Sequence, residues 1–378
     1  MKVAEIVEGR TRLLVPEGSL GKAEPPTVPA FFNPAASTNR DITVAAIQAT
    51  RGRSFCDVLS GVGARGIRVA REVRRELDVA FVEVNAVSLG LAKRSARING
   101  VMRRCTFVKG DANAFLWARN RNEQRFDYVD VDPFGTPAPY LQGALNAVTD
   151  GGLISITATD TAVLCGVYPR TARRRYRATP LNNSFHHETA VRILVNACRS
   201  VGGALDIGVF PVLAHSTRHY IRAYLRAEVG ASKADEAMKS EGYVSACRKC
   251  DDVSAGAEPV RVCSRCGGKN SVAGPLWVSR LSDSSFLAGT TTASKKLGFG
   301  RAPKVLESLA GVDDFPPYSF SLEEICSKLR VASVSPEKVG ESLWRNGFRT
   351  HVQPFEKTGL KTDAAYADVV SAVREASR

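Results

Sequence analysis

From about residue 54 onward, the chain alternates short apolar runs with longer stretches of helical spacing. The apolar runs have the length of buried β-strands and lie at 54–59, 79–84, 105–108, 126–131 and 153–158. Helical patterns separate them at 64–77, 86–99, 112–120 and 139–149. Strands and helices in regular alternation predict a parallel sheet with right-handed crossovers. The fold class is therefore α/β and Rossmann-like.

The pattern changes toward the end of this region. A helix at 188–200 precedes two successive strands at 205–212 and 220–228, which we expect to form an antiparallel hairpin that completes a mostly parallel sheet of seven strands. After residue 228 the composition becomes rich in Lys, Glu and Ser, which predicts two domains, 1–228 and 229–378. Ser321 and Ser335 lie where helix caps are expected, and a strand at 348–352 follows these helices. The C-terminal domain is predicted to be a smaller α+β, winged-helix-like unit.

An N-terminal extension precedes the first strand. It contains a proline-rich passage, 24–34, and a predicted helix from Asn39 to Thr50 with Asn39 as its cap. A helical set of arginines beginning at Arg68 is expected to form an exposed face.

The chain is basic, with 52 Lys and Arg against 38 Asp and Glu among 378 residues, a formal charge of +14. This excess favours a polyanionic partner. Five arginines crowd a short segment after the fifth strand, at positions 170, 173, 174, 175 and 177. They suit contacts with nucleic-acid phosphates, although a solvated basic turn would have the same sequence pattern.

No apolar run approaches the ~20 residues of a membrane span and no signal peptide is evident, so we expect a cytoplasmic protein without a membrane partner. The sequence indicates no protein partner.

A glycine-rich loop follows the first strand of the sheet. Gly61, Gly63 and Gly66 fit the G-x-G-x-x-G pattern, in which the backbone turns sharply and passes close to a ligand. Alone, the pattern also fits a tight strand-to-helix turn or a nicotinamide-dependent oxidoreductase.

Three carboxylates discriminate between these possibilities. Glu83, Asp111 and Asp132 come at the ends of the second, third and fourth strands, so they should line one crevice with the glycine loop. A dehydrogenase needs only the first acid. A methyltransferase that uses S-adenosylmethionine (SAM) uses one acid for the ribose, one for the adenine and one facing the methyl acceptor.

The segment Asp132-Pro133-Phe134-Gly135 suggests the acceptor. An ionised Asp132 could accept a hydrogen bond from an exocyclic amine and favour the positive charge that develops on attack. Phe134, or Phe31 and Phe32, could stack on the base. Since such an amine is hidden in a stacked nucleic acid, we expect the base to be flipped out.

Four cysteines form two Cys-x-x-Cys pairs, Cys247 with Cys250 and Cys263 with Cys266. This spacing is typical of a structural zinc site of four thiolates, with iron or a redox pair as alternatives. The other five cysteines are scattered and are expected to be buried thiols. His186 and His187 could bind a metal, but no further ligand is near them in the sequence, and a helix start is favoured.

Several motifs in this order resemble the tRNA guanine-26 N2-dimethyltransferase family in its archaeal form. They are 31–34 (FFNP), 39–41 (NRD), 60–68 (SGVGARGIR), 132–135 (DPFG), 157–160 (TATD), 274–277 (GPLW) and 358–362 (TGLKT). The resemblance covers nearly the whole chain. It implies SAM as cofactor, tRNA as substrate, and two successive methyl transfers to the N2 amine of guanine 26.

The resemblance also implies roles for individual residues. Arg40 and Arg65 would hold the methionine part of the cofactor, Glu83 its ribose, and Asp111 with the backbone of Ala112 its adenine. The family often has aspartate where this chain has Glu83.

Asp132 would be the catalytic acceptor, with Phe31 and Phe134 shaping the guanine pocket. Methylation of another exocyclic amine in RNA, oxidoreduction with a nicotinamide cofactor, and tRNA binding without catalysis are the alternatives.

Overall fold

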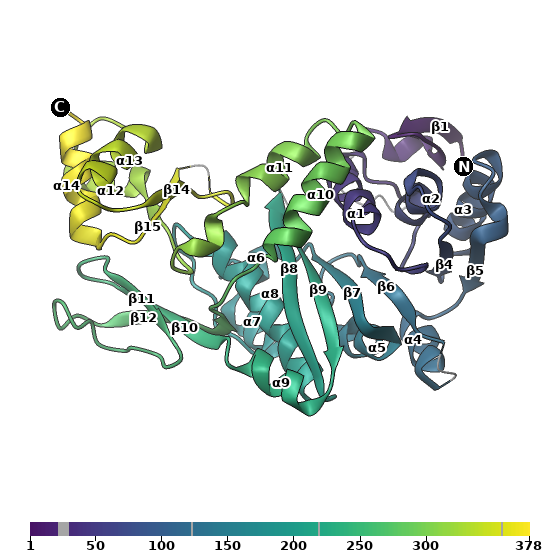
Figure 1. The fold of residues 1–378 in the computed structure, drawn as a ribbon, viewed down its shortest axis with the longest axis horizontal. Coiled ribbons are helices and arrows are strands. Elements are labelled where there is room, and N and C mark those ends of the chain that lie inside the picture. Colours follow the sequence, from purple (N-terminus) through teal and green to yellow (C-terminus); the bar gives the residue numbers. More distant parts are fainter. Residues whose placement is uncertain (22–29, 122–123, 218–219, 357) are drawn as a thin grey trace. The chain divides into compact units, whose positions relative to one another are not determined.

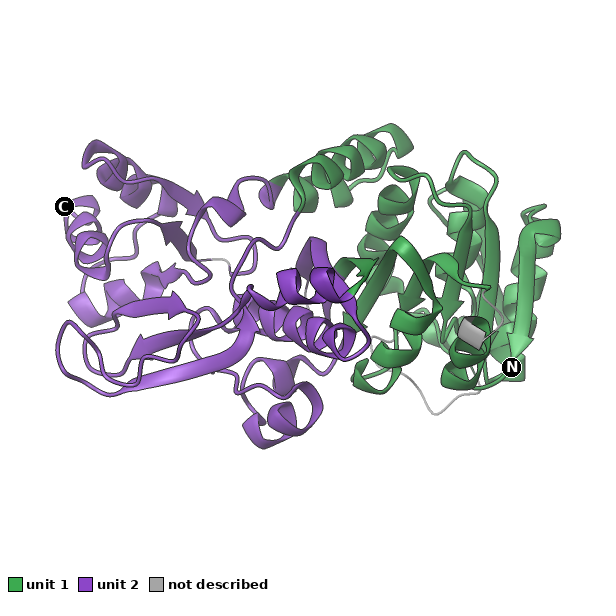
Figure 2. Ribbon diagram, turned by 60° about the horizontal axis from the view of Figure 1, so that its bottom comes forward, with its two compact units in different colours: residues 1–157, 224–230, 283–307 green, residues 158–223, 231–282, 308–378 purple. Residues whose placement is uncertain are grey.

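The computed structural model describes residues 1–21, 30–121, 124–217, 220–356 and 358–378 (Figure 1). Residues 24–29 of the proline-rich passage lie outside this part. The chain forms two compact units that alternate along the sequence (Figure 2). Unit 1 comprises Met1–Thr157, Tyr224–Gly230 and Asp283–Glu307, and unit 2 comprises Ala158–Ala223, Ala231–Ser282 and Ser308–Arg378. The division into domains 1–228 and 229–378 stays a prediction.

The main sheet has seven strands within the described residues, in the order β5-β4-β3-β6-β7-β9-β8. They are β3 (Ser54–Val58), β4 (Asp78–Glu83), β5 (Cys105–Lys109), β6 (Phe126–Val131), β7 (Val148–Ala158), β8 (Ile207–Thr217) and β9 (Tyr220–Val229). The neighbours from β5 to β7 pair in parallel, which confirms the predicted α/β fold with a mostly parallel sheet. β3 and β6 are buried along most of their length, although each contains acidic residues, Asp57 in β3 and Asp127 and Asp130 in β6.

The structure describes the following helices in unit 1, the last of which ends one residue beyond that unit. They are α1 (Ser37–Gln48), α2 (Ala64–Glu72), α3 (Ala86–Ile98), α4 (Ala112–Arg121), α5 (Leu141–Ala147), α10 (Ser284–Leu297) and α11 (Ala302–Ser308). α2 contacts β3 and β4, and α3 contacts β4 and β5. α1 packs against both α2 and α10. A hairpin of β1 (Val3–Glu8) and β2 (Thr11–Pro16) precedes them.

Unit 2 contains further helices and two small antiparallel sheets. Its helices are α6 (Thr161–Leu164), α7 (Pro169–Tyr176), α8 (His186–Gly203), α9 (Ala231–Met238), α12 (Leu322–Leu329), α13 (Pro336–Arg345) and α14 (Tyr366–Ala376). The sheets are β11-β10-β12 and β13-β15-β14, formed by β10 (Glu241–Cys247), β11 (Val253–Gly256), β12 (Asn270–Trp277), β13 (Phe320–Ser321), β14 (Thr350–Val352) and β15 (Gly359–Thr362). Ser321 and Ser335 cap α12 and α13 as predicted.

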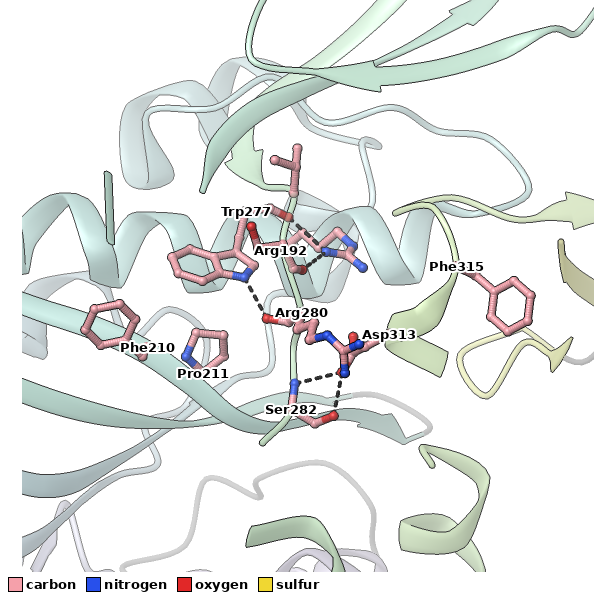
Figure 3. A pocket seen from close by; sticks show the side chains of 10 residues that line it. Arg192, Phe210, Pro211, Trp277, Arg280, Ser282, Asp313 and Phe315 are labelled. Carbon is pink, nitrogen blue, oxygen red and sulfur yellow. Dashed lines mark hydrogen bonds between the residues drawn. The ribbon is translucent and has the colours of Figure 1, made fainter. Parts of the chain in front are cut away.

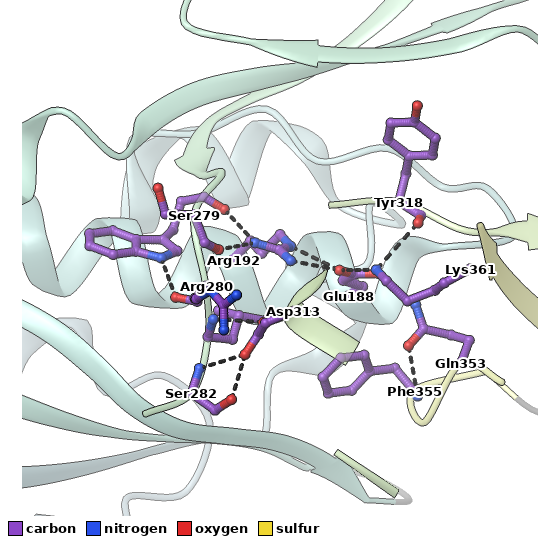
Figure 4. A network of polar contacts seen from close by, with 12 residues as sticks. Glu188, Arg192, Ser279, Arg280, Ser282, Asp313, Tyr318, Gln353, Phe355 and Lys361 are labelled. Atoms are coloured by element: carbon purple, nitrogen blue, oxygen red, sulfur yellow. Dashed lines mark hydrogen bonds and ion pairs between the residues drawn. The ribbon is translucent and has the colours of Figure 1, made fainter. Parts of the chain in front are cut away.

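A buried ionic network holds α8 to the C-terminal part of unit 2 (Figure 4). The Glu188 carboxylate accepts hydrogen bonds from Arg192, one turn further along α8, and from the Lys361 ammonium at 2.8 Å. Gln353 also donates to Glu188. All four side chains are nearly or fully buried. Burial raises the pKa of Glu188, but the cations Lys361 and Arg192 outweigh it and leave that pKa below its usual value.

Arg192 also borders an open hollow of about 500 Å³ in unit 2 (Figure 3). Its guanidinium donates to the carbonyl oxygens of Trp277 and Ser279, and the Trp277 indole N–H donates to the carbonyl of Arg280. Asp313 accepts from the amide and hydroxyl of Ser282. These contacts fix the segment after β12.

Among the described residues, none of the helices combines the length and apolarity that crossing a bilayer requires.

Candidate active site

The glycine loop lies between β3 and α2, at the carboxyl edge of the sheet. Gly61 and Gly63 have positive φ angles of 54° and 73°, a backbone conformation that favours glycine. A Cβ at Gly63 would lie 2.6 Å from the Cβ of Ala92, so a side chain is excluded there. A Cβ at Gly61 would meet no atom within 4 Å, so the backbone at Gly61 faces open space. The loop can therefore approach a ligand closely.

Two of the predicted carboxylates lie at the same edge. Glu83 accepts hydrogen bonds from the backbone N–H groups of Gly61 and Asn85, both at 2.8 Å. Asp111 accepts from the N–H of Ala114 at 2.8 Å, at the start of α4, whose first residue is Ala112. The N–H of Gly110 donates to the carbonyl of Glu83. The structure thus links the glycine loop, Glu83 and the turn before α4.

The side-chain hydroxyl of Ser60, at this edge of the sheet, could bind a polar group of a ligand. The Ser60 Oγ is buried and has no hydrogen-bond partner within the described part of the chain. Buried hydroxyls are normally satisfied, so the atom is suited to meet a ligand group. Together with the open side of Gly61, this supports a cofactor at the glycine loop.

Arg65, on the first turn of α2, connects the end of β6 to α1. Its side chain is 5% exposed and forms ion pairs with Asp130 on β6, at 3.2 Å, and with Asp132 just after β6. It also donates to Asn39 and Thr43 of α1. The prediction that Asn39 caps this helix is wrong, because α1 begins at Ser37 and the Asn39 oxygen serves Arg65 instead.

The two aromatic residues predicted to shape a base pocket lie together. The rings of Phe31 and Phe134 have centroids 5.7 Å apart and are tilted by 56°. Phe134 is 71% exposed, although it follows a buried strand. The exposed Phe134 ring and the half-buried Phe31 ring beside it are suited to stack on a flat base.

Arg40 orders the segment that carries Phe31. Its guanidinium pairs with Glu8 on β1 through two hydrogen bonds, and it donates to the carbonyl of Asn33 at 3.0 Å. It also lies 4.7 Å from the centre of the Phe32 ring. In this structure Arg40 therefore organises the chain around Phe31.

Arg68 of α2 is fully buried, so the expectation that it belongs to an exposed arginine face is wrong. It pairs with Glu72, Glu8 and Asp41 at 2.7–2.9 Å. Helical spacing alone did not show this, since two of its partners come from the N-terminal extension.

Asp57, near the end of β3, belongs to the site but was missed from the sequence. It is paired in register with Asp130 on the neighbouring strand β6, and accepts a hydrogen bond from the N–H of Gly66 at 2.9 Å. Burial, reinforced by the negative charge of Asp130, raises the pKa of Asp57 to about 8. An acid inside an otherwise apolar strand was the signal that could have revealed it.

Replacing Asp57 by Asn should change how stability depends on pH. Between pH 3.8 and about 8 the folded wild type retains the Asp57 proton while the unfolded chain loses it. The free energy of unfolding of the wild type should therefore fall relative to Asp57→Asn as pH rises, by up to about 1.4 kcal/mol per pH unit. Urea unfolding at pH 5 and pH 7.5 measures this difference, with the exposed Asp78→Asn as control. Parallel pH curves for wild type and Asp57→Asn would contradict the assignment.

The four paired cysteines converge in unit 2. The Sγ atoms of Cys247 and Cys266 are 3.5 Å apart, and those of Cys250 and Cys263 are 3.7 Å apart. A tetrahedral zinc with Zn–S bonds of about 2.3 Å separates its sulfurs by about 3.8 Å. A Cβ at Gly268 would crowd the Sγ atoms of Cys266 and Cys247, which shows how closely the backbone wraps the cluster. The two measured sulfur separations therefore match those of the predicted four-thiolate zinc site.

Comparisons with known proteins identify the family to which the chain belongs. The family model of the N2,N2-dimethylguanosine tRNA methyltransferases matches residues 9–374. A tRNA (guanine(26)-N(2))-dimethyltransferase of Methanothermobacter thermautotrophicus is 34% identical over 96% of each chain. Its counterpart from Methanopyrus kandleri is 35% identical over 97% of this chain and 95% of its own. The solved structure of Trm1 from Pyrococcus horikoshii, in complex with SAM, superposes with a TM-score of 0.85 at 28% identity, covering 98% of this chain and 99% of that one. The chain belongs to the family of N2,N2-dimethylguanosine tRNA methyltransferases.

Proposed function

We propose that this protein transfers methyl groups from SAM to the N2 amine of guanine 26 in tRNA, giving N2-methylguanosine and then N2,N2-dimethylguanosine. The observation that carries the proposal is the placement of Asp132 and Phe134 directly after β6, with Phe31 against Phe134, at the edge that also holds the glycine loop. The type of reaction, methyl transfer to a tRNA guanine, follows from the family to which the chain belongs.

The cofactor is assigned to the glycine loop and the adjacent strand ends. Glu83 would accept from the ribose hydroxyls, since each carboxylate oxygen has more than one lone pair and its present partners are two backbone amides. Asp111 would accept from the adenine amine and the backbone of Ala112 would lie against the adenine ring. Gly61 and Gly63 would let the backbone approach the cofactor.

Arg40 and Arg65 are the candidates for the methionine part. Each is already engaged, Arg40 by Glu8 and Arg65 by Asp130 and Asp132. Contact with the methionine carboxylate would therefore use a guanidinium N–H beyond those bonds or replace one of them.

SAM, when bound, supplies a methyl group that is electrophilic because it is carried by a sulfonium. Asp132 would accept a hydrogen bond from the guanine N2–H and hold the nitrogen lone pair toward that methyl group. As the new N–C bond formed, the bond from the methyl carbon to the sulfonium would break and leave S-adenosylhomocysteine. Asp132, when ionised, would stabilise the positive charge that develops on the amine and accept its departing proton. A carboxylate has about four lone-pair sites, so Asp132 can serve the amine while it remains paired with Arg65.

The tRNA would present its base to Phe31 and Phe134, which stack on it once it is flipped out. The arginines of α7 and its end, at positions 170, 173, 174, 175 and 177, are exposed and are proposed to contact tRNA phosphates. Arg175 is partly engaged by Asp160, so Arg170 and Arg174 are the stronger candidates.

Cys247, Cys250, Cys263 and Cys266 are proposed to bind a structural Zn²⁺ in a C-terminal tRNA-binding domain. Four thiolates fill a tetrahedral zinc completely, so the ion would stabilise the segment without taking part in methyl transfer. Its sulfurs already lie near the required separation.

Transfer of labelled methyl groups to a tRNA transcript tests the proposed site of modification. We expect incorporation of up to two methyl groups per tRNA, and none above background when guanine 26 is replaced by adenine. Equal labelling of both transcripts would point to another exocyclic amine. Absence of any SAM binding would instead favour the non-catalytic or nicotinamide-dependent alternatives, neither of which finds support among the relatives described above.

A further inference from the structure

A second cluster of metal-binding side chains lies in unit 2, apart from the four paired cysteines. The Cys165 Sγ and one ring nitrogen each of His186 and His187 lie within 4.8 Å of one another. In the sequence the histidine pair lacks a third ligand, because 20 residues separate it from Cys165. The fold supplies that ligand.

The backbone explains why the cysteine reaches the histidines. Cys165 is the C-cap residue that directly follows α6, and the next residue, Gly166, has a φ of 93°. A Cβ at Gly166 would lie 2.8 Å from the backbone nitrogen of Asn182. The backbone at Gly166 therefore packs closely against Asn182, in the segment that leads to the start of α8 at His186.

Both imidazole rings are oriented by hydrogen bonds at Nδ1. The His186 Nδ1 contacts the carbonyl of Asn183, and the His187 Nδ1 contacts the Glu356 carboxylate at 2.8 Å. We assign the proton to Nδ1 in both rings, since each partner is an acceptor. Nε2 is then the nitrogen that can bind a metal. A histidine held by a carboxylate or carbonyl through its other nitrogen is the usual arrangement at metal sites.

We propose that Cys165, His186 and His187 bind a Zn²⁺ ion that is distinct from the one assigned to the four paired cysteines. One thiolate and two imidazoles are ligands that zinc prefers, and a water would complete the tetrahedron. Zinc with bonds of about 2.0–2.3 Å separates such ligand atoms by about 3.3–3.6 Å. The ligand atoms here lie within 4.8 Å of one another, so binding would require the side chains to rotate and bring the two Nε2 atoms and the Cys165 Sγ to that separation.

The charges around the cluster suit a divalent cation. Cys165 would supply one negative charge once the metal displaces its thiol proton, and the Glu356 carboxylate, hydrogen-bonded to His187, lies beside it. Glu356 also accepts from the backbone N–H of His187, so it is fixed at the start of α8. The ion would fasten α6 and the loop that carries Glu356 to the first turn of α8.

Zinc content per chain of the full-length protein tests this site. After growth with zinc and removal of loosely bound metal, we expect two equivalents in the wild type. His186→Gln and Cys165→Ser should each lose one equivalent, Cys263→Ser should lose the other, and His351→Gln, a histidine elsewhere in unit 2, should lose none. Zinc in His186→Gln and Cys165→Ser equal to that in His351→Gln would overturn the proposal.

The design separates the two metal sites. A single equivalent that is lost in Cys165→Ser but kept in Cys263→Ser would support this site and refute the four-cysteine site, and the reverse pattern would overturn this proposal alone. Cobalt-substituted wild type provides a readout if the variants fail to fold. Its visible spectrum should contain a mixed sulfur and nitrogen component, and the spectrum of a pure four-thiolate site would overturn the proposal.

Discussion

Replacing Asp132 by Asn should lower the rate of methyl transfer by about 10³-fold, since a positioned proton acceptor typically contributes 10²–10⁴-fold. Asparagine keeps the size of the side chain but removes its negative charge and its ability to take the proton. Binding of SAM should persist, because Arg65 remains held by Asp130, Asn39 and Thr43 when its partner at position 132 is neutral.

Two measurements distinguish loss of chemistry from loss of the site. Single-turnover transfer to tRNA reports the chemical step, and calorimetric titration with SAM reports the cofactor site. The matched control is Asp78→Asn, an exposed aspartate at the start of β4, which should be fully active. A rate for Asp132→Asn within tenfold of wild type would remove Asp132 from the proposed role.

Replacing Glu188 by Gln should lower the free energy of unfolding by about 3–5 kcal/mol, the usual cost of leaving buried charge without its partner. The variant leaves the Lys361 ammonium and the Arg192 guanidinium near each other without their shared anion (Figure 4). Denaturant unfolding measures the loss, with the exposed Glu341→Gln of α13 as control.

A second variant shows whether the charges cause this effect. Lys361→Met should lower the free energy of unfolding by less than Glu188→Gln does, because Arg192 still neutralises Glu188. The double variant Glu188→Gln, Lys361→Met should have a higher free energy of unfolding than Glu188→Gln alone, since one of the two unpaired buried cations is removed. If the double variant is less stable than Glu188→Gln alone, the charge argument is wrong.

The sequence predicted the main sheet well because local pattern determines it. β4 is buried between its two ends, so its apolar run is uninterrupted there. The glycine loop directly follows β3 and marks the turn into α2. Caps such as Ser321 were also predictable, since a cap involves residues three positions apart. The alternation of the two units along the chain was not predictable, because it depends on long-range packing.

The candidate site was predicted as a set of strand-end residues, but their partners were not. Pairing of Asp132 with Arg65 joins residues 67 positions apart, and burial of Arg68 depends on Glu8 of the N-terminal hairpin. The histidine pair was interpreted as a helix start, and His186 does begin α8. Its proximity to Cys165 depends on the close packing of Gly166, which no sequence pattern encodes.

The position of α10 in unit 1 has a consequence for synthesis of the protein. α10 packs on α1, and Phe299 just beyond it lies 5.1 Å beneath the guanidinium of Arg68. During synthesis, nearly 300 residues must therefore be made before α1 can pack against α10. Until then, the part of α1 that α10 covers stays exposed in the nascent chain, although α2 can already pack on α1. A fragment truncated before Asp283 would keep that part exposed permanently and be prone to aggregate.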